Sequence, residues 1–284
     1  MARATLRTVT DQSVPATDPP PATTIGDGIV VLRTVHRFGG GIAAVAEAIQ
    51  HGNAGAAVDA LRDGDDAGVD WIELDPGSPD AVGGLHDVRH ALVENARRVR
   101  DAALAGDAPT ALAGLGAVRV LCAHRHGPYG AATWAEFIES WLDCEIDGYR
   151  DAGRWYPGRP VLMTQNDYGL RLYNGDLGVI IEREGRRLAV FERRDGLVAV
   201  SPTRLEAIET VHAMTIHKSQ GSQFDAVVVV LPPVSSPILT RELLYTAVTR
   251  GRRRLVVIGA EDSVRAAVSR PIARASGLRN ALWG

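Results

Sequence analysis

Short runs of almost continuous apolar residues constrain the fold more than any other feature of this chain. The clearest are 118–123 (Val-Arg-Val-Leu-Cys-Ala) and 227–231 (Val-Val-Val-Val-Leu), and 254–258 is a third. Runs of this length without polar alternation are typical of strands that are buried on both faces, as in a parallel sheet. The chain has 284 residues and is 45% hydrophobic, which is enough for a large core of this kind.

Segments with helical periodicity separate the apolar runs. In 42–49, Ile42, Val45 and Ile49 fall on one face of a helix. Further helices are predicted at 56–61, 87–105, 133–146 and 241–249, and further strands at 29–32 and 69–74. Alternating strands and helices favour a doubly wound α/β layer with right-handed crossovers.

The pattern changes between 159 and 206. Short strand-like pieces are separated there by Asn174-Gly175, Glu184-Gly185 and Asp195-Gly196, which are strong turn signals. We therefore expect a small antiparallel barrel inserted into the α/β domain. The predicted organisation is an irregular lead-in (1–27), a first part of the α/β domain (28–158), the insert (159–206) and the rest of the α/β domain (207–284).

Composition excludes several classes of protein. The formal net charge is −3, so any contact with nucleic acid must come from a local groove. Cys122 and Cys144 lack metal-ligand spacing, which favours reduced thiols, a cytoplasmic protein and no metal site. The sequence has no apolar run near the roughly 20 residues that span a bilayer, and its first residues lack the apolar middle of a signal peptide.

The polar segment 213–225 leads directly into the valine run, which places its side chains at a sheet edge where open α/β folds bind ligands. It carries hydroxyl, imidazole, ammonium and amide groups, and its Lys218 is the only lysine in the chain. Such donors suit the phosphate oxygens of a nucleic acid. The structural alternative, a polar helix cap and turn, is the weaker interpretation because the single lysine lies here.

A second polar feature follows the helix predicted at 241–249. Arg250 ends that helix and precedes a glycine and a core strand. A guanidinium at this place can reach across a domain cleft to a phosphate. The alternative, basic residues that complement a helix dipole, accounts well for Arg252 and Arg253 but less well for Arg250.

Together these segments resemble the RecD-type superfamily 1 DNA helicases. Thr-Ile-His-Lys-Ser-Gln-Gly-Ser at 215–222 resembles their motif V, Tyr-Thr-Ala-Val-Thr-Arg at 245–250 resembles motif VI, and 33–38 resembles motif IV. The stretches 120–128 and 164–176 are also typical of this family. The resemblance extends from residue 29 to the C-terminus, and the combination of motifs is highly specific.

The resemblance implies a RecA-like doubly wound parallel sheet with an inserted SH3-like β-barrel. It implies that Arg37 and Arg250 are catalytic and contact the γ-phosphate of ATP, and that Gly221 and Gln223 bind the nucleotide. Many relatives have glutamate in place of Gln223, which keeps the hydrogen-bonding capacity without the charge. The residues implied to bind single-stranded DNA are Thr215, His217, Lys218, Ser219, Gln220, Thr164, Asn166 and Asn174.

Such helicases also need a P-loop, Gly-x-x-x-x-Gly-Lys-Ser/Thr, and an acidic pair that binds Mg²⁺. The 284 residues contain neither pattern, because Lys218 does not follow a glycine-rich loop. We therefore expect ATP and Mg²⁺ to bind in a cleft that a P-loop-containing N-terminal RecA-like domain completes, in cis or in trans. Alone, the chain is expected not to hydrolyse ATP.

Three functional hypotheses follow. The first is the C-terminal motor half of an ATP-dependent 5′-to-3′ helicase, the RecD subunit of a RecBCD-like exodeoxyribonuclease V in double-strand-break repair, with RecB- and RecC-like subunits as partners. The second is an inactive single-stranded DNA-binding or assembly module derived from such a helicase. The third is a related branch such as the conjugative relaxase-helicases, which share motifs V and VI.

Overall fold

The computed structural model describes residues 40–64, 68–78, 83–149, 151, 153–193 and 195–272. The chain divides into a unit of residues 1–36 and a unit of residues 37–284, and every described residue belongs to the second. The predicted lead-in, the predicted strand at 29–32 and Arg37 lie outside the described residues.

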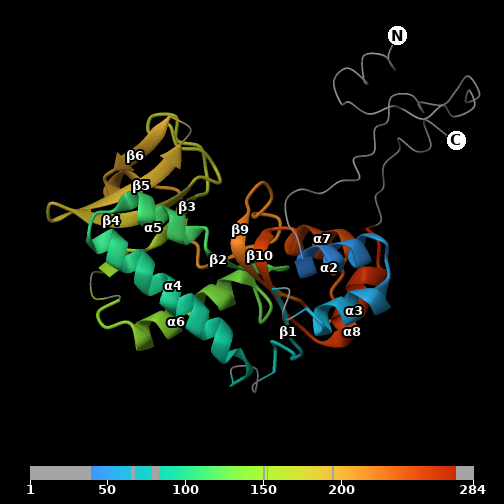
Figure 1. The fold of residues 1–284 in the computed structure, drawn as a ribbon. Coiled ribbons are helices and arrows are strands. Elements are labelled where there is room, and N and C mark those ends of the chain that lie inside the picture. The colour runs from blue at the N-terminus through green and yellow to red at the C-terminus, as the bar shows by residue number, and fades with distance from the viewer. Residues whose placement is uncertain are drawn as a thin grey trace, which may run out of the picture. The chain divides into compact units, whose positions relative to one another are not determined.

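A five-stranded parallel sheet forms the centre of this unit (Figure 1). Its strands, in spatial order, are β1 (Val69–Ile72), β10 (Gly251–Ile258), β9 (Phe224–Val230), β2 (Val118–Cys122) and β8 (Ala213–Thr215). The apolar runs form the middle of the sheet, as the sequence predicts. The short strand β8 carries no apolar run of its own and was not expected.

The valine run is continuous because successive side chains enter two different cores. Val227 and Val229 of β9 pack on one face of the sheet, and Val228 and Val230 pack on the other. All four are almost fully buried, and each such side chain contributes about 1.5 to 3 kcal/mol relative to an exposed one. The expectation of a doubly wound α/β layer is therefore confirmed.

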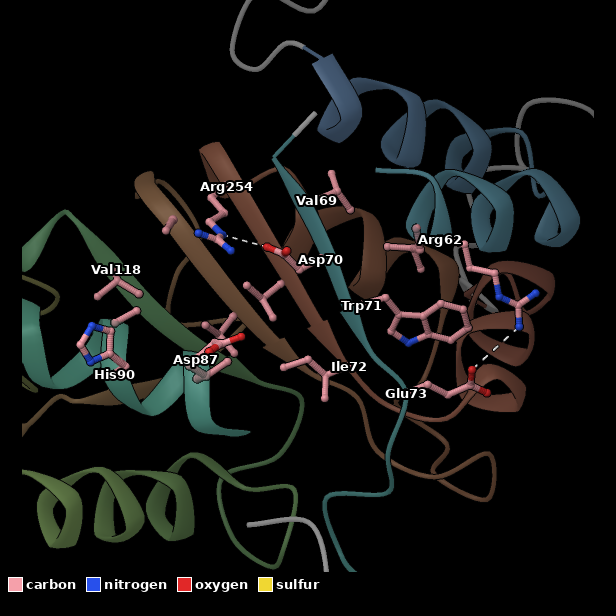
Figure 2. A pocket seen from close by; sticks show the side chains of 16 residues that line it. Arg62, Val69, Asp70, Trp71, Ile72, Glu73, Asp87, His90, Val118 and Arg254 are labelled. Atoms are coloured by element: carbon pink, nitrogen blue, oxygen red, sulfur yellow. Dashed lines mark hydrogen bonds and ion pairs between the residues drawn. The ribbon is translucent and has the colours of Figure 1, made fainter. Parts of the chain in front are cut away.

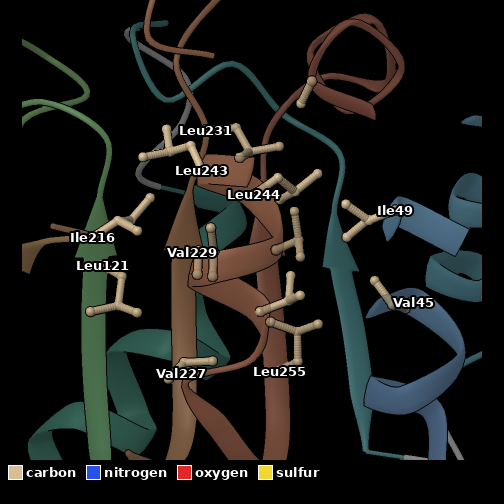
Figure 3. Packing of buried hydrophobic residues seen from close by; sticks show 14 of the residues in the cluster. Val45, Ile49, Leu121, Ile216, Val227, Val229, Leu231, Leu243, Leu244 and Leu255 are labelled. Atoms are coloured by element: carbon tan, nitrogen blue, oxygen red, sulfur yellow. The ribbon is translucent and has the colours of Figure 1, made fainter. Parts of the chain in front are cut away.

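Four helices cover the first face: α2 (Gly40–Gln50), α3 (Ala54–Arg62), α7 (Arg241–Val248) and α8 (Glu261–Ser269). Figure 3 shows Val45 and Ile49 of α2, and Leu243 and Leu244 of α7, in the same core as the strand residues Val227, Val229 and Leu255. Asn53 caps α3 by accepting the Ala56 N–H at 3.0 Å, which is a preferred role for asparagine.

Helices α4 (His86–Leu104) and α6 (Ala131–Glu145) cover the second face. The short helix α5 (Ala108–Leu115) packs on α4 and on strand β4 of the insert. Asp107 caps α5 by accepting the Thr110 N–H at 3.1 Å. Helix α5 was not predicted from the sequence, because half of its eight residues are alanine or glycine and the segment gives little periodic signal.

The insert is a five-stranded antiparallel sheet between α6 and β8. Its strands are β3 (Pro160–Met163), β4 (Leu177–Arg183), β5 (Arg186–Arg193), β6 (Gly196–Val200) and β7 (Ile208–Thr210), in the spatial order β6-β5-β4-β3-β7. The 3₁₀ turn Gly153–Trp155 precedes the insert, and the 3₁₀ turn Pro202–Arg204 lies between β6 and β7. Glu184-Gly185 and Asp195-Gly196 connect neighbouring strands, as their turn chemistry predicts.

The insert has its own small core around Val161, Ile180 and Phe191. Its edge strands are β6 and β7, and β7 lies after residue 206, the predicted end of the insert. The prediction of antiparallel strands in the insert is confirmed, whereas closure of these strands into an SH3-like barrel stays a prediction. Within the described ranges, no helix is both long and apolar enough to cross a membrane.

Candidate nucleotide and nucleic-acid interface

The segment 216–223 runs from one end of the parallel sheet to the other. It leaves β8 after Thr215, which pairs with Cys122 at the carboxyl end of β2. It enters β9 at Phe224, which pairs with Gly251 at the amino end of β10. Thr215 and Gln223 therefore lie at opposite ends of the sheet, and this crossing segment connects the two.

Consecutive backbone turns build the crossing segment around Ser219. The Ser219 side chain is completely buried, and its hydroxyl donates to the Ile216 carbonyl at 2.7 Å. The Gln220 N–H donates to the His217 carbonyl at 3.2 Å, and the Lys218 N–H donates to the Thr215 hydroxyl at 3.3 Å. These bonds give Ser219 and Thr215 structural roles within the turn. Their predicted contacts with DNA stay predictions.

At the amino end of the sheet, residues of the crossing segment, of α7 and of the turn that follows α7 line a hollow of about 490 Å³. We call it the Arg250 hollow, and its lining residues are Gln220, Gly221, Gln223, Thr246 and Arg250. The structure thus brings together Arg250, Gly221 and Gln223, which the sequence assigns to the nucleotide.

Two backbone carbonyls hold the guanidinium of Arg250. Its Nε donates to the Thr246 carbonyl on α7, and its Nη1 donates to the Ser222 carbonyl, each at 3.1 Å. The first bond is local to the end of the helix, and the second reaches the crossing segment. Arg250 is therefore held at the wall of the hollow with a defined orientation, as recognition of a phosphate requires.

Two further features of the Arg250 hollow concern Gln223 and Gly221. The side-chain nitrogen Nε2 of Gln223 is buried and has no hydrogen-bond partner among the described residues, while Oε1 accepts from Arg252 Nε at 3.4 Å. A buried amide of this kind is usually satisfied by some ligand or water. Gly221 has a φ of +88°, and a Cβ atom there would meet open space. The position thus favours glycine for its backbone conformation.

At the carboxyl end of the sheet, Lys218 and Arg125 both form ion pairs with Glu209, a residue of the insert. Lys218 Nζ lies 2.6 Å from Glu209 Oε2, and Arg125 Nη2 lies 3.0 Å from Glu209 Oε1. His217 and Gln220 line a smaller hollow of about 330 Å³ together with residues of α7 and the loop before it. Gln220 lies between the two ends, since it lines both hollows.

The three insert residues that the sequence assigns to DNA lie in and beside the loop between β3 and β4. The side chain of Asn166 accepts the Asn174 N–H at 2.9 Å, and the Thr164 N–H donates to the Ala207 carbonyl at 2.9 Å, next to β7. The structure brings Asn166 and Asn174 together. Thr164 is placed near the edge strand that carries Glu209.

Sequence reasoning missed several groups around these sites. Tyr168 and Tyr173 in the same loop are 76% and 40% exposed, with ring centroids 6.3 Å apart, and the Arg193 guanidinium lies 4.8 Å from the Tyr173 ring centroid. Two tyrosines in a polar loop were a usable signal for a stacking surface. Arg125 and Glu209 were missed because their pairing depends on the tertiary fold.

A larger hollow of about 810 Å³ lies elsewhere, against the edge strand β1 and the start of α4 (Figure 2). Figure 2 shows the ion pair between Arg254 Nε and Asp70 Oδ2, at 2.8 Å, within it. None of the residues that the sequence assigns to nucleotide or nucleic acid lines this hollow. Across the described parts of the chain, no group of three or more His, Cys, Asp or Glu side chains is placed to hold a metal ion.

Comparison with known proteins agrees with the motifs. The family model of the UvrD-like helicase C-terminal domain matches residues 210–258, which include the crossing segment and Arg250. The RecBCD enzyme subunit RecD of Mycolicibacterium smegmatis is 47% identical over 256 residues, which are 90% of this chain and 44% of that protein. The ATP-dependent RecD2 DNA helicase of Deinococcus radiodurans is 35% identical over 160 residues, 56% of this chain and 22% of that protein.

Among solved structures, Bacteroides Pif1 bound to single-stranded DNA aligns with 58% of this chain and 45% of its own, at 17% identity and a TM-score of 0.35. That likeness is too slight to support a comparison of sites. The chain spans less than half the length of the curated RecD proteins of Mycolicibacterium smegmatis and Mycobacterium tuberculosis. Over about nine-tenths of its length, this chain is thus similar in sequence to proteins named RecBCD enzyme subunit RecD.

Proposed function

We propose that this chain is the C-terminal motor half of an ATP-dependent RecD-type DNA helicase. The observation that carries the proposal is the crossing segment 216–223. At one end it lines the Arg250 hollow, and at the other it presents Lys218. A single short segment therefore joins a candidate nucleotide site to a candidate nucleic-acid site, which is the connection that a translocating motor needs.

On the nucleotide side, Arg250 would contact the γ-phosphate of ATP, and Gly221 and Gln223 would lie against the nucleotide. A guanidinium in such a position stabilises the charge that develops on the transferred phosphoryl group. Arg37 would make a second contact of this kind. The P-loop lysine and the Mg²⁺ ligands would come from an N-terminal RecA-like domain, because the 284 residues have no such pattern.

On the nucleic-acid side, residues of 215–220 would contact the phosphates of a single strand, and the loop of Thr164, Asn166 and Asn174 would extend that surface onto the insert. The exposed Tyr168 and Tyr173 suit stacking on unpaired bases. The RecD relatives are named as subunits of RecBCD enzymes. By analogy, RecB- and RecC-like subunits would be partners in double-strand-break repair, with translocation from 5′ to 3′.

The test is ATP hydrolysis with and without single-stranded DNA, by this chain alone and by a mixture with the P-loop-containing N-terminal portion of a RecD relative. DNA-stimulated hydrolysis in the mixture, and none by the chain alone, is the expected result. Robust hydrolysis by the chain alone would contradict the proposal.

The same experiment addresses the alternative of an inactive DNA-binding or assembly module. Salt-dependent binding of single-stranded DNA without hydrolysis in any mixture would support this alternative.

A further inference from the structure

We infer that Arg125 and Lys218 form one phosphate-binding subsite for a single strand, and that the carboxylate of Glu209 occupies this subsite when no strand is bound. The inference rests on the proposed function and adds Arg125 and Glu209 to it. Glu209 acts as a competitor, so its displacement helps to set the affinity for DNA.

The geometry of the Glu209 carboxylate supports this subsite. Its two oxygens meet two different cations, with Oε1 3.0 Å from Arg125 Nη2 and Oε2 2.6 Å from Lys218 Nζ. The two non-bridging oxygens of a phosphodiester present a similar pair of acceptors. A phosphate can therefore replace the carboxylate without moving either cation far.

The positions of Arg125 and Lys218 in the fold also support the subsite. Cys122 of β2 and Thr215 of β8 are register partners at the carboxyl end of the parallel sheet. Arg125 follows Cys122 by three residues, and Lys218 follows Thr215 by three. Two neighbouring strands thus deliver one cation each to the sheet edge where open α/β folds bind their ligands.

All three ion-paired side chains are accessible to solvent. The side chains of Arg125, Lys218 and Glu209 are 65%, 40% and 40% exposed. Ion pairs at this exposure are weak, because solvent and salt screen them. A strand that engages several cations at once also releases its condensed counterions, so it can displace a single carboxylate.

Glu209 comes from the insert and not from the parallel sheet. It lies on β7, an edge strand of the insert, and pairs there with Leu162 of β3. The Thr164 N–H donates to the carbonyl of Ala207 on the segment that leads into β7. Glu209 therefore lies on the strand next to Thr164, where the insert loop that carries Asn166 and Asn174 begins.

The test uses the full chain and a fluorescein-labelled oligothymidylate, with binding followed by fluorescence anisotropy over a series of salt concentrations. Glu209→Gln keeps the shape and removes the charge, and should tighten binding by about 3- to 10-fold at low salt, with a smaller gain at high salt. Glu206→Gln makes the same charge change on a nearby exposed glutamate. It is the matched control and should leave the affinity nearly unchanged.

Removal of either cation should act in the opposite direction. Arg125→Gln should weaken binding by about 3- to 10-fold at low salt and lower the slope of log affinity against log salt by about 1. Arg204→Gln, a charge loss elsewhere on the insert, should do neither. In an Arg125→Gln/Lys218→Gln background, Glu209→Gln should no longer tighten binding, and thermal denaturation should show that each variant is folded.

The outcomes separate the subsite from the proposed function. If the wild-type chain binds DNA but Glu209→Gln binds no tighter than Glu206→Gln, the subsite is wrong and the proposed function stands. If Arg125→Gln weakens binding no more than Arg204→Gln, the subsite is wrong in the same way. If neither the wild-type chain nor any variant binds the oligonucleotide, the proposed DNA contacts and the subsite both fail.

Discussion

The guanidinium of Arg250 donates a hydrogen bond to the Ser222 carbonyl at 3.1 Å, and this bond ties the end of α7 to the crossing segment between β8 and β9. A movement of Arg250 toward a phosphate would therefore act on the segment whose other end carries Lys218. Contiguous contacts of this kind can couple two sites when the segment has two arrangements.

Ser219 should be a structural residue of the crossing segment. Ser219→Ala removes the buried hydrogen bond to the Ile216 carbonyl, and should lower the free energy of unfolding by about 1 kcal/mol, or roughly 2 to 4 °C in Tm. Ser222→Ala, at an exposed position, should change Tm little. Thermal denaturation followed by circular dichroism compares the two, and equal Tm values for both variants would rule out this role.

Gln223 should contribute to nucleotide binding. Its buried Nε2 has no partner among the described residues, so a bound nucleotide can supply one. In a mixture with a P-loop-containing half, Gln223→Ala should raise the KM for ATP by about 5- to 10-fold and leave kcat unchanged, because it removes a contact made equally in the ground and transition states. A change in kcat alone would place Gln223 elsewhere in the mechanism.

Tyr168 should stack on an unpaired base, because its ring is 76% exposed in the loop that carries Asn166 and Asn174. Tyr168→Ala should weaken binding of oligothymidylate by about 1 to 3 kcal/mol, while Tyr168→Phe keeps the ring and should bind almost as the wild type does. The anisotropy assay described above measures both. Equal losses for the two variants would assign the effect to the hydroxyl and not to the ring.

Asp107 should make the stability of α5 depend on acid. Its hydrogen bonds with Thr110, from the side chain and then from the backbone, lower the pKa of Asp107 below 3.8. Because the folded pKa is the lower one, the stabilising contribution of the charge is present above 3.8 and is lost as the pH falls through the folded value.

Asp107→Asn keeps an amino-terminal cap but cannot ionise. The stability difference between the wild type and Asp107→Asn, from urea unfolding, should therefore shrink as the pH is lowered below 3.8. Asp143→Asn, an exposed carboxylate on α6, is the control. A difference that is constant with pH would show that the charge of Asp107 does not stabilise the helix.

The sequence anticipated the centre of the fold better than its margins. Val227 to Val230 predicted a strand buried on both faces, because each side of the sheet needs its own apolar side chains. Helix α5 and the strands β7 and β8 were not anticipated. The two strands are only three residues long and depend on neighbours that are distant in sequence, such as Leu162 for Glu209.

Some residues of the candidate site could be predicted from the sequence, and others could not. Arg250 and Gln223 were recognisable from the motifs that contain them, and the fold places both at one hollow. Glu209 could not be recognised from the sequence. Its candidate role depends on ion pairs with Arg125 and Lys218, which lie on other segments of the fold. The structure also separates what the sequence grouped together, because Thr215 and Gln223 belong to opposite ends of the sheet.

The most direct test of the central claim is the rate of DNA-stimulated ATP hydrolysis by the Arg250→Ala chain mixed with a P-loop-containing N-terminal half. If Arg250 stabilises the transferred phosphoryl group, kcat should fall by about 10³-fold or more. Arg253→Ala should keep the wild-type rate, since the Arg253 side chain is 82% exposed and does not line the hollow. DNA binding should be unchanged in both variants. A mixture in which Arg250→Ala hydrolyses ATP as fast as Arg253→Ala would contradict the account.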